Sequence, residues 1–419
     1  MSANYSLHEN FPTYFAMRLE STPHNTSLSA LNKSEISHGG GMTDREAYII
    51  LNIISGIGPA RVKSLCEHFG SVSNILGAPK KELLAVNGIG ETLAEAVVSW
   101  RTDTDYESEM KLAERAGVEI VTLADDKYPS ILKEVHDAPL CIYSRGRFPS
   151  DGEFMLGVVG SRRITNYGKA MAEHLSRSAV YAGWTVVSGL AYGTDAVAHK
   201  TVVDAGGRTI AVLGGGLARI FPQDHIPLAK SIIEGGGAVI SEFPMEFAPN
   251  RRSFPMRNRI ISGLSKGVLV IEAGSSSGAL ITAKFALEQN RLIFSVPGEA
   301  SNPQARGCNA LIKQGAKLTE NFEDIMEEFE FLPEFSPPRN LKVIDGDGVK
   351  DESDFAALKL DEDECRIIGL LKNGDASADS LAGETGISTG KLLSLLMKME
   401  MKKLITQLPG KRFSLRSNK

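Results

Sequence analysis

The sequence predicts an α/β protein with a doubly wound, mostly parallel β-sheet, an all-α domain before the sheet and a small domain of helices and a hairpin after it. Three observations predict this arrangement. Short apolar strands alternate with helical periodicity from about Met155 to Ile325, which is typical of a parallel sheet covered on both faces. A Gly-Ile-Gly motif occurs twice in a helical stretch before this region. Three short helical segments precede an apolar-Pro-Gly-basic hairpin at the end.

The composition of the 419 residues restricts the class of protein. The length predicts two to four domains. The hydrophobic content is 42%, and no apolar run approaches the ~18 residues of a membrane-spanning helix, so no membrane contact is expected. Residues 1–43 lack the basic flank and apolar stretch of a secretory signal, so we expect a disordered tail on a cytoplasmic protein. The four cysteines form no CxxC pair or Cys/His cluster, which predicts neither disulfides nor a metal site.

The charges are distributed unevenly along the chain. The net charge is -5, from 46 basic and 51 acidic residues. One basic stretch, residues 251–266, holds Arg251, Arg252, Arg257, Arg259 and Lys266 and no acidic residue. A second stretch, residues 391–419, holds Glu400 as its one acidic residue. Its basic residues are Lys391, Lys398, Lys402, Lys403, Lys411, Arg412, Arg416 and Lys419. Two basic stretches in an acidic protein predict focused anion sites.

The expected helical domain spans residues 44–120. Its near-repeat, "SGIGPARVKSL" and "NGIGETLAEAV", places Gly-Ile-Gly between helical stretches twice and resembles tandem helix-hairpin-helix motifs, which bind DNA backbones. The second hairpin carries acidic residues where a phosphate would lie. Two interpretations therefore stay open: contact with DNA, or a helical domain whose glycines only form tight turns.

The central domain is expected over residues 121–330. Ligands of such sheets bind at the carboxyl ends of the strands. The predicted strands are "FMLGVVG", "WTVVSG", "RTIAVLGG", "GAVISEF", "KGVLVIEA" and "RLIFSVP". The predicted helices begin at Tyr167, Thr194, Ile226, Phe254, Ala279 and Asn309.

The C-terminal part is expected to contain a linker, residues 331–358, and a winged helix, residues 359–419. The third helix of the winged helix is predicted from Ser388 to Lys403, and its hairpin from Leu404 to Leu415. The basic charge of residues 391–419 favours nucleic-acid contact only slightly, because winged helices also serve as protein-docking or lid modules.

The first predicted strand ends in Gly160, Ser161, Arg162 and Arg163. Backbone N–H groups and the dipole of the following helix would face an anion there, with a hydroxyl from Ser161 and a planar guanidinium from Arg162. This pattern predicts a phosphate site. The dinucleotide fingerprint GxGxxG and the acidic residue that would bind a ribose are both missing, so we expect no nicotinamide cofactor, and no cofactor of any other kind.

Two further turns follow predicted strands at the same edge. Gly193 and Thr194 in "SGLAYGTDAVAH" allow close approach of the backbone to a ligand, and Asp195 is expected to cap the next helix. In "EAGSSSGALITAKFAL", the segment from Ser275 to Gly278 offers consecutive N–H donors, and Thr282 offers a hydroxyl. We assign no chemistry to the lone His199.

The segment "PNRRSFPMRNRIISGLSKG" combines cations with an aromatic ring. Arg251, Phe254, Arg257 and Asn258 follow a spacing of about three residues, which would align their side chains at a helix N-terminus. Arginines suit the phosphates of single-stranded nucleic acid, and a ring can stack an unpaired base at ~1–3 kcal/mol per base. A Phe254 buried under the helix is the competing interpretation.

Taken together, "GVVGSRRITNYG", "SGLAYGTDAVAH", "FPMRNRIISGLS" and "EAGSSSGALITAKFAL" resemble the DNA-processing family called DprA or Smf, over about residues 45–330. The resemblance implies an extended Rossmann-like fold that binds single-stranded DNA, forms a homodimer, protects incoming DNA and places RecA on it in natural transformation. It implies no catalytic activity. The DNA-binding residues that follow from the motifs and this resemblance are Ser161, Arg162, Gly193, Thr194, Arg251, Phe254, Arg257, Asn258, Lys266, Gly278 and Thr282.

Two alternatives remain. The family is distantly similar to LOG-type phosphoribohydrolases, whose motif GGxGTxxE supplies a catalytic carboxylate. This chain has Gly278-Ala279-Leu280-Ile281-Thr282 in place of that motif. Glu272, which precedes the turn, is the carboxylate that could substitute. A protein adaptor that binds no nucleic acid is the other alternative. The sequence also departs from many relatives at Phe221, where they carry Tyr.

Overall fold

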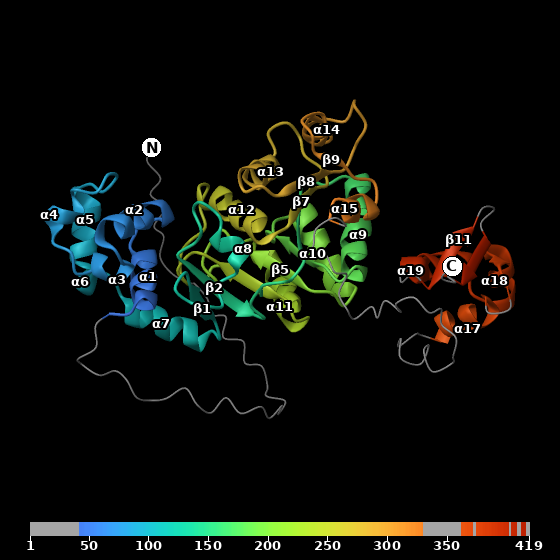
Figure 1. Ribbon diagram of the computed structural model, residues 1–419, viewed down its shortest axis with the longest axis horizontal. Coiled ribbons are helices and arrows are strands. Elements are labelled where there is room, and N and C mark those ends of the chain that lie inside the picture. The colour runs from blue at the N-terminus through green and yellow to red at the C-terminus, as the bar shows by residue number, and fades with distance from the viewer. Residues whose placement is uncertain (1–41, 330–361, 372–373, 402–403, 409–411, 416–419) are drawn as a thin grey trace, which may run out of the picture. The chain divides into compact units, whose positions relative to one another are not determined.

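A computed structural model describes residues 42–329, 362–371, 374–401, 404–408 and 412–415 (Figure 1). The chain divides into two compact units, Met1–Glu328 and Phe329–Lys419. The expected linker, residues 331–358, and all but the last two residues of the expected tail, residues 1–43, lie outside the described residues.

Seven helices form the first part of the larger unit. They are α1 Asp44–Ile53, α2 Pro59–Phe69, α3 Val72–Ile75, α4 Lys80–Leu83, α5 Glu91–Val98, α6 Trp100–Asp103 and α7 Tyr106–Arg115. The two Gly-Ile-Gly turns are equivalent, since Gly56 and Gly88 both have φ of 85° and the isoleucines that follow them are both buried. Arg61 joins the turns, because its guanidinium donates to the carbonyl oxygens of Gly56 and Gly88.

A nine-stranded sheet follows. Its strands are β1 Glu119–Thr122, β2 Cys141–Gly146, β3 Met155–Val159, β4 Thr185–Ser188, β5 Thr209–Val212, β6 Ala238–Ser241, β7 Gly267–Val270, β8 Leu292–Ser295 and β9 Lys317–Leu318. Their order is β1-β2-β6-β5-β4-β3-β7-β8-β9, and all neighbours from β6 to β9 are parallel. The predicted mostly parallel, doubly wound fold is therefore confirmed, and each of the six predicted strands is present.

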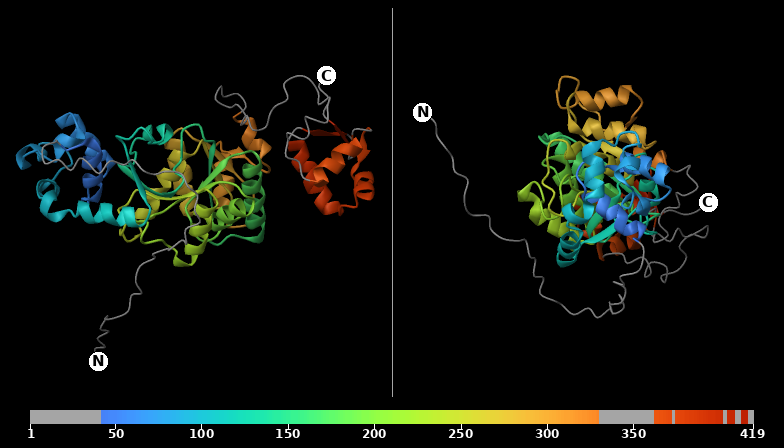
Figure 2. Two further views of the ribbon diagram at one scale, coloured as in Figure 1. Left: turned by 90° about the horizontal axis from the view of Figure 1, so that it is seen from below. Right: turned by 90° about the vertical axis from the view of Figure 1, so that its left-hand side faces the viewer.

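Helices cover both faces of this sheet (Figures 1 and 2). They are α8 Ser130–Lys133, α9 Asn166–Tyr181, α10 Thr194–Asp204, α11 Ile226–Glu234, α12 Ser253–Leu264, α13 Gly278–Glu288, α14 Arg306–Lys313 and α15 Glu323–Glu327, with a 3-10 helix η1 at Gln223–His225. Buried residues of α12 and α13 pack on one face, and Ala229 and Ile232 of α11 pack on the other. Both layers bury the apolar strands, as the sequence pattern requires.

The sequence did not predict the antiparallel β1 and β2, which pair with each other and join the sheet at β6. These two strands share a core with the N-terminal helices: Ile49 and Ile50 of α1 belong to the same buried cluster as Tyr143 of β2. This shared core explains why the predicted segments 44–120 and 121–330 form one compact unit.

The smaller unit contains α17 Glu362–Leu371, α18 Ala378–Thr385 and α19 Thr389–Met401. Its sheet has the order β10-β12-β11, with β10 Ala376–Ser377, β11 Ile405–Leu408 and β12 Arg412–Leu415. Leu392 and Leu396 of α19 pack with Phe413 of the hairpin in its core. Three helices and this hairpin confirm the predicted winged helix. In the described part of the chain, we find no helix with the length and apolarity needed to span a membrane.

Candidate nucleic-acid interface

The predicted site lies where the sheet changes its winding direction. β3 and β7 are neighbours, and the chain continues from β3 to β4 on one side and from β7 to β8 on the other. The turns after these two strands therefore diverge and leave a crevice, where open α/β sheets bind ligands. A cavity of about 810 Å³ occupies this position.

The cavity brings together most of the predicted residues. Its lining includes Ser161, Arg162, Arg251, Phe254, Arg257, Asn258, Gly278 and Thr282. Gly193, Thr194 and Lys266 do not line it. We call the exposed or partly exposed part of this region the trough, defined as Arg162, Arg163, Arg251, Phe254, Ser275, Ser276, Gly278 and Arg306.

The turn after β3 is held from behind. The backbone N–H and the hydroxyl of Thr194 both donate to the carbonyl oxygen of Ser161, over 3.1 and 3.3 Å. Gly193 has φ of 78°, and a methyl group there would lie 2.3 Å from the same oxygen. Thr194 is fully buried. This corrects the expectation that Gly193 and Thr194 contact DNA, because they support the turn and lie behind it.

Ser161 is itself largely buried, and its hydroxyl accepts from the backbone N–H of Arg163 and lies 3.4 Å from Gln304 Oε1. The hydroxyl thus shapes the turn as well as lining the cavity. The side chain of Arg162 is exposed, and its guanidinium carbon lies 5.6 Å from the centroid of the Phe254 ring. This places a cation against an aromatic ring at the rim of the cavity.

Phe254 occupies the first turn of α12 and is partly exposed. Its ring packs on Gly214, where a methyl group would lie 2.8 Å from Phe254 Cδ1. Burial of this ring under the helix, the competing interpretation, does not hold, because the ring faces Arg162 and lines the cavity. Arg251, two residues before the helix, is exposed beside it.

The turn after β7 supplies main-chain donors. Ser277 caps α13, with its hydroxyl accepting from the N–H of Ala279. The backbone N–H groups of Ser275 and Ser276 donate to no partner within the described residues. Gly278 is exposed at the start of α13, whereas Thr282 lies one turn further and is buried in the cavity wall. Consecutive free N–H groups at a helix N-terminus are suited to an anion.

Arg257 lies beneath the trough and is only 5% exposed. Its Nη1 donates to the carbonyl oxygens of Gly189 and Val212, and its Nε donates to Asn258 Oδ1 at 2.9 Å. Nη2 lies 3.9 Å from Asp195 Oδ2. Burial lowers the pKa of Arg257 to about 10. Its guanidinium holds the ends of β4 and β5, so the predicted contact of Arg257 with DNA stays a prediction for a residue in the wall of the cavity.

Asp195 differs from its predicted capping role. Its Oδ2 accepts from the backbone N–H groups of Gly189 and Ala191, which precede α10. Burial raises the pKa of Asp195, and Arg257 opposes that shift. Asp195 therefore organises the loop after β4 and pairs with Arg257.

Asn258 connects the buried layer to the trough, since its Nδ2 lies 3.4 Å from the carbonyl oxygen of Gly278. Lys266, in contrast, lies at the opposite edge of the sheet, away from the cavity. Its backbone N–H donates to Met155 at the start of β3. The reason is geometric: twelve residues of α12 rise ~18 Å, which carries the chain back to the amino ends of the strands.

Glu272 serves the fold. Its carboxylate accepts from both the backbone N–H and the hydroxyl of Thr165, at 2.9 and 2.6 Å, and its side chain is 2% exposed. Gly168 packs against it, since a methyl group there would lie 2.4 Å from Oε2. A carboxylate fixed in this way is not available to a ribose.

The exposed arginines of the trough have no acidic partners in the part of the chain that the structure describes. Among the described residues, none of Arg162, Arg163, Arg251 and Arg306 lies within 4.0 Å of a carboxylate. Arg163 and Arg306 were missed in the sequence. Arg163 could have been chosen for its position beside Arg162, but Arg306 begins α14, whose distance from the turn after β3 the sequence does not reveal.

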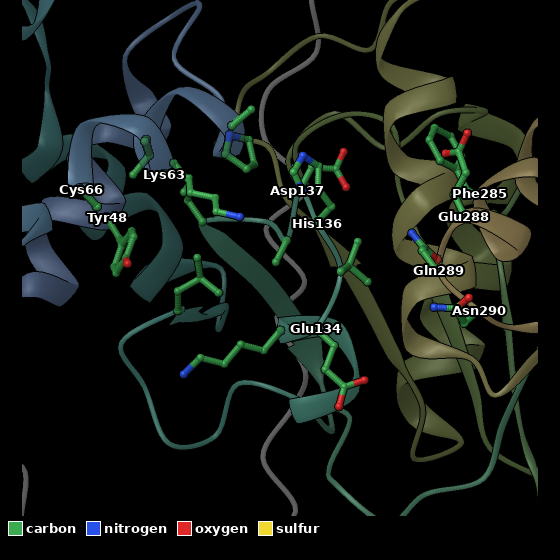
Figure 3. Close-up of a pocket in the computed structure, with 18 of the residues that line it drawn as sticks. Tyr48, Lys63, Cys66, Glu134, His136, Asp137, Phe285, Glu288, Gln289 and Asn290 are labelled. Atoms are coloured by element: carbon green, nitrogen blue, oxygen red, sulfur yellow. The ribbon is translucent and has the colours of Figure 1, made fainter. Parts of the chain in front are cut away.

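A second cavity, of about 1050 Å³, lies between the N-terminal helices on one side and the α8 region and the end of α13 on the other (Figure 3). Lys63 comes from α2, His136 and Asp137 from the segment between α8 and β2, and Gln289 from the end of α13. The lining mixes both signs of charge and holds none of the predicted DNA-binding residues. This larger cavity is therefore not the predicted site.

Comparisons with known proteins identify the family and its domains. The family model described as DNA recombination-mediator protein A matches residues 119–330, a SAM-like helix-hairpin-helix tandem matches 50–99, and a DprA winged helix domain matches 351–411. The protein Smf of Synechocystis is 32% identical, with 87% of this chain and 96% of that protein covered. The DNA processing protein DprA of Bacillus subtilis is 43% identical, with 55% of this chain and 75% of that protein covered.

The crystal structure of DNA processing protein A from Streptococcus pneumoniae has a TM-score of 0.60 and 31% identity, covering 70% of this chain and all of that one. The family description names a recombination mediator. The chain belongs to the DNA recombination-mediator protein A family, which is the DprA or Smf family of DNA-processing proteins.

Proposed function

We propose that the trough binds single-stranded DNA without reading its sequence. The observation that carries this proposal is the combination, at one sheet edge, of exposed arginines without acidic partners, a partly exposed phenyl ring and free main-chain N–H groups. The arginines and N–H groups suit phosphates, and the ring suits an unpaired base. Duplex DNA offers no free base face to such a ring.

The lining also supports binding over hydrolysis. A phosphoribohydrolase needs a carboxylate free to face the ribose, where it would stabilise an oxocarbenium-like centre. Glu272, the substitute considered for that role, is buried and hydrogen-bonded to Thr165.

The binding experiment compares Arg162→Ala with Arg115→Ala, an exposed arginine at the end of α7 that removes the same charge elsewhere. Fluorescence anisotropy with a labelled oligo-dT measures both. We expect Arg162→Ala to weaken binding by about 1–3 kcal/mol, as for a charge-assisted contact, and Arg115→Ala to leave it unchanged. Equal affinities for the two variants would remove the proposal. Release of free base from nucleoside monophosphates by the native protein would instead favour the hydrolase.

We further propose that the bound strand is protected and passed to the RecA recombinase during natural transformation, by a homodimer. The family description as a recombination mediator supports this role. Three measurements test it: resistance of bound oligonucleotide to a single-strand nuclease, the rate of RecA filament formation on DNA already coated with single-strand-binding protein, and the mass of the protein in solution. No acceleration of filament formation would exclude the mediator role, even if DNA binding persists.

A further inference from the structure

A second phenyl ring lies next to the trough. Phe221 belongs to the loop between β5 and η1, and its side chain is 51% exposed. Its ring centroid lies 5.9 Å from that of Phe254, and the planes of the two rings are inclined by 52°. About half of this phenyl ring is therefore accessible to a ligand.

The loop that carries Phe221 is fixed on both sides. The hydroxyl of Tyr192 donates to Asp224 Oδ2 at 2.8 Å, and His225 Nδ1 lies 2.8 Å from the carbonyl oxygen of Leu190. The N–H of Ala218 donates to Met245 at 2.9 Å. The ring is therefore presented by a loop that needs little reorganisation to bind, which lowers the entropic cost of binding.

A cation accompanies this ring as well. Arg219, two residues before Phe221, is exposed and lies within 4.0 Å of no acidic group in the described residues. The loop thus carries an exposed arginine and an accessible ring two residues apart, the same two kinds of side chain that Arg162 and Phe254 bring together in the trough. This pairing is the composition of a surface that binds single strands.

We propose that Phe221 is a second base-stacking residue and that Arg219 binds a phosphate beside it, so that the DNA site extends from the trough over the end of β5. This inference rests on the proposed binding of single-stranded DNA. Because the rings are inclined by 52°, bases lying flat on both cannot stay stacked on each other. The two nucleotides on these rings are therefore splayed apart.

The test measures the affinity of Phe221→Ala, Phe221→Leu and Phe221→Tyr for oligo-dT of increasing length, by fluorescence anisotropy. Tyr181→Ala is the matched control, because Tyr181 is 46% exposed at the far end of α9. We expect Phe221→Ala and Phe221→Leu to weaken binding about 5-fold to 100-fold on long oligonucleotides. On the shortest oligonucleotide that still binds through Phe254, the loss should disappear. Phe221→Tyr and Tyr181→Ala should bind as the native protein does.

Native affinity for Phe221→Ala at every length, with binding lost in Phe254→Ala, overturns this inference and leaves the proposed function intact. Absence of binding by the native protein overturns the proposed function itself. Phe221→Leu keeps an apolar side chain at the same position, so a loss in Phe221→Leu with native thermal stability assigns the effect to the missing ring.

Discussion

The trough and the winged helix are both basic in the sequence, but the fold treats their cations differently. In the trough, Arg162 and Arg251 have no acidic group within 4.0 Å among the described residues. In the winged helix, Lys391 lies 2.5 Å from Asp363, and Lys398 lies 2.8 Å from Glu364. We therefore expect a stretch of positive sequence charge to bind anions only where the fold brings no carboxylate to it.

The exposed side of α19 supports the same contrast. Leu393 and Met397, one turn apart, are both large exposed apolar residues. An apolar helix face is more typical of contact with protein than with phosphates. The protein-docking alternative for the winged helix is thus favoured by its surface, whereas the sequence charge slightly favoured nucleic acid.

The largest expected effect concerns the arginine that supports the trough. Arg257→Ala leaves Asp195 buried without its cation and removes the donor to Gly189 and Val212, so we expect a loss of ~3–5 kcal/mol in the free energy of unfolding. Both tryptophans of the chain, Trp100 and Trp184, lie in the larger unit, so their fluorescence during urea unfolding reports this unit. Arg162→Ala is the control and should change stability by less than ~0.5 kcal/mol. Equal losses of unfolding free energy in Arg257→Ala and Arg162→Ala would contradict the division between an exposed Arg162 and a buried, supporting Arg257.

A smaller effect is expected at the turn after β3. Gly193→Ala places a methyl group against the carbonyl oxygen of Ser161 at positive φ, which should cost ~1–3 kcal/mol and weaken binding of oligo-dT. Gly278→Ala is the control for stability, because a methyl group there meets no atom within 4 Å. Urea unfolding and anisotropy measure the two quantities. If Gly193→Ala is destabilised but binds oligo-dT with native affinity, the turn after β3 is not needed for DNA binding.

Acid should lower the free energy of unfolding of the larger unit more than that of the winged helix. His199 is fully buried, and burial lowers its pKa to about 3, whereas its pKa in the unfolded chain is about 6.5. Between these values the unfolded state binds the extra proton, so stability is lost as the pH falls from 6.5 towards 3, by up to ~1.4 kcal/mol per pH unit. The raised pKa of Asp195 acts in the opposite direction, so His199→Leu is needed to isolate the effect. The winged helix contains no histidine. A steeper pH dependence in His199→Leu than in the native protein would contradict this assignment.

The smallest effect is expected in the winged helix. Removing Lys391 and Lys398 together should change the affinity for oligo-dT by less than about twofold, since both side chains already face carboxylates. A tenfold loss, measured by anisotropy at low salt, would show that these cations reach DNA and would end the contrast with the trough.

The sequence predicted the six central strands because each is a short apolar run bounded by a glycine or a change of period. It predicted binding at the carboxyl edge of the sheet because phosphate-type turns follow these strands. It could not predict the burial of Arg257, whose carbonyl partners Gly189 and Val212 lie 68 and 45 residues away. The length of α12 does explain the distance of Lys266 from the site, since a helix that starts at the binding edge ends at the opposite edge. The carboxylates that pair with Lys391 and Lys398 lie in α17, outside the basic stretch that was counted.

The free N–H groups of Ser275 and Ser276 have a consequence for how this site tolerates change. Every residue other than proline carries the same amide, so replacing these serines leaves both of these proposed phosphate donors in place. A substitution series restricted to side chains is therefore expected to leave some affinity for DNA. That remaining affinity would come from the peptide backbone. Such a contact is robust to drift in the gene and indifferent to the order of bases in the strand.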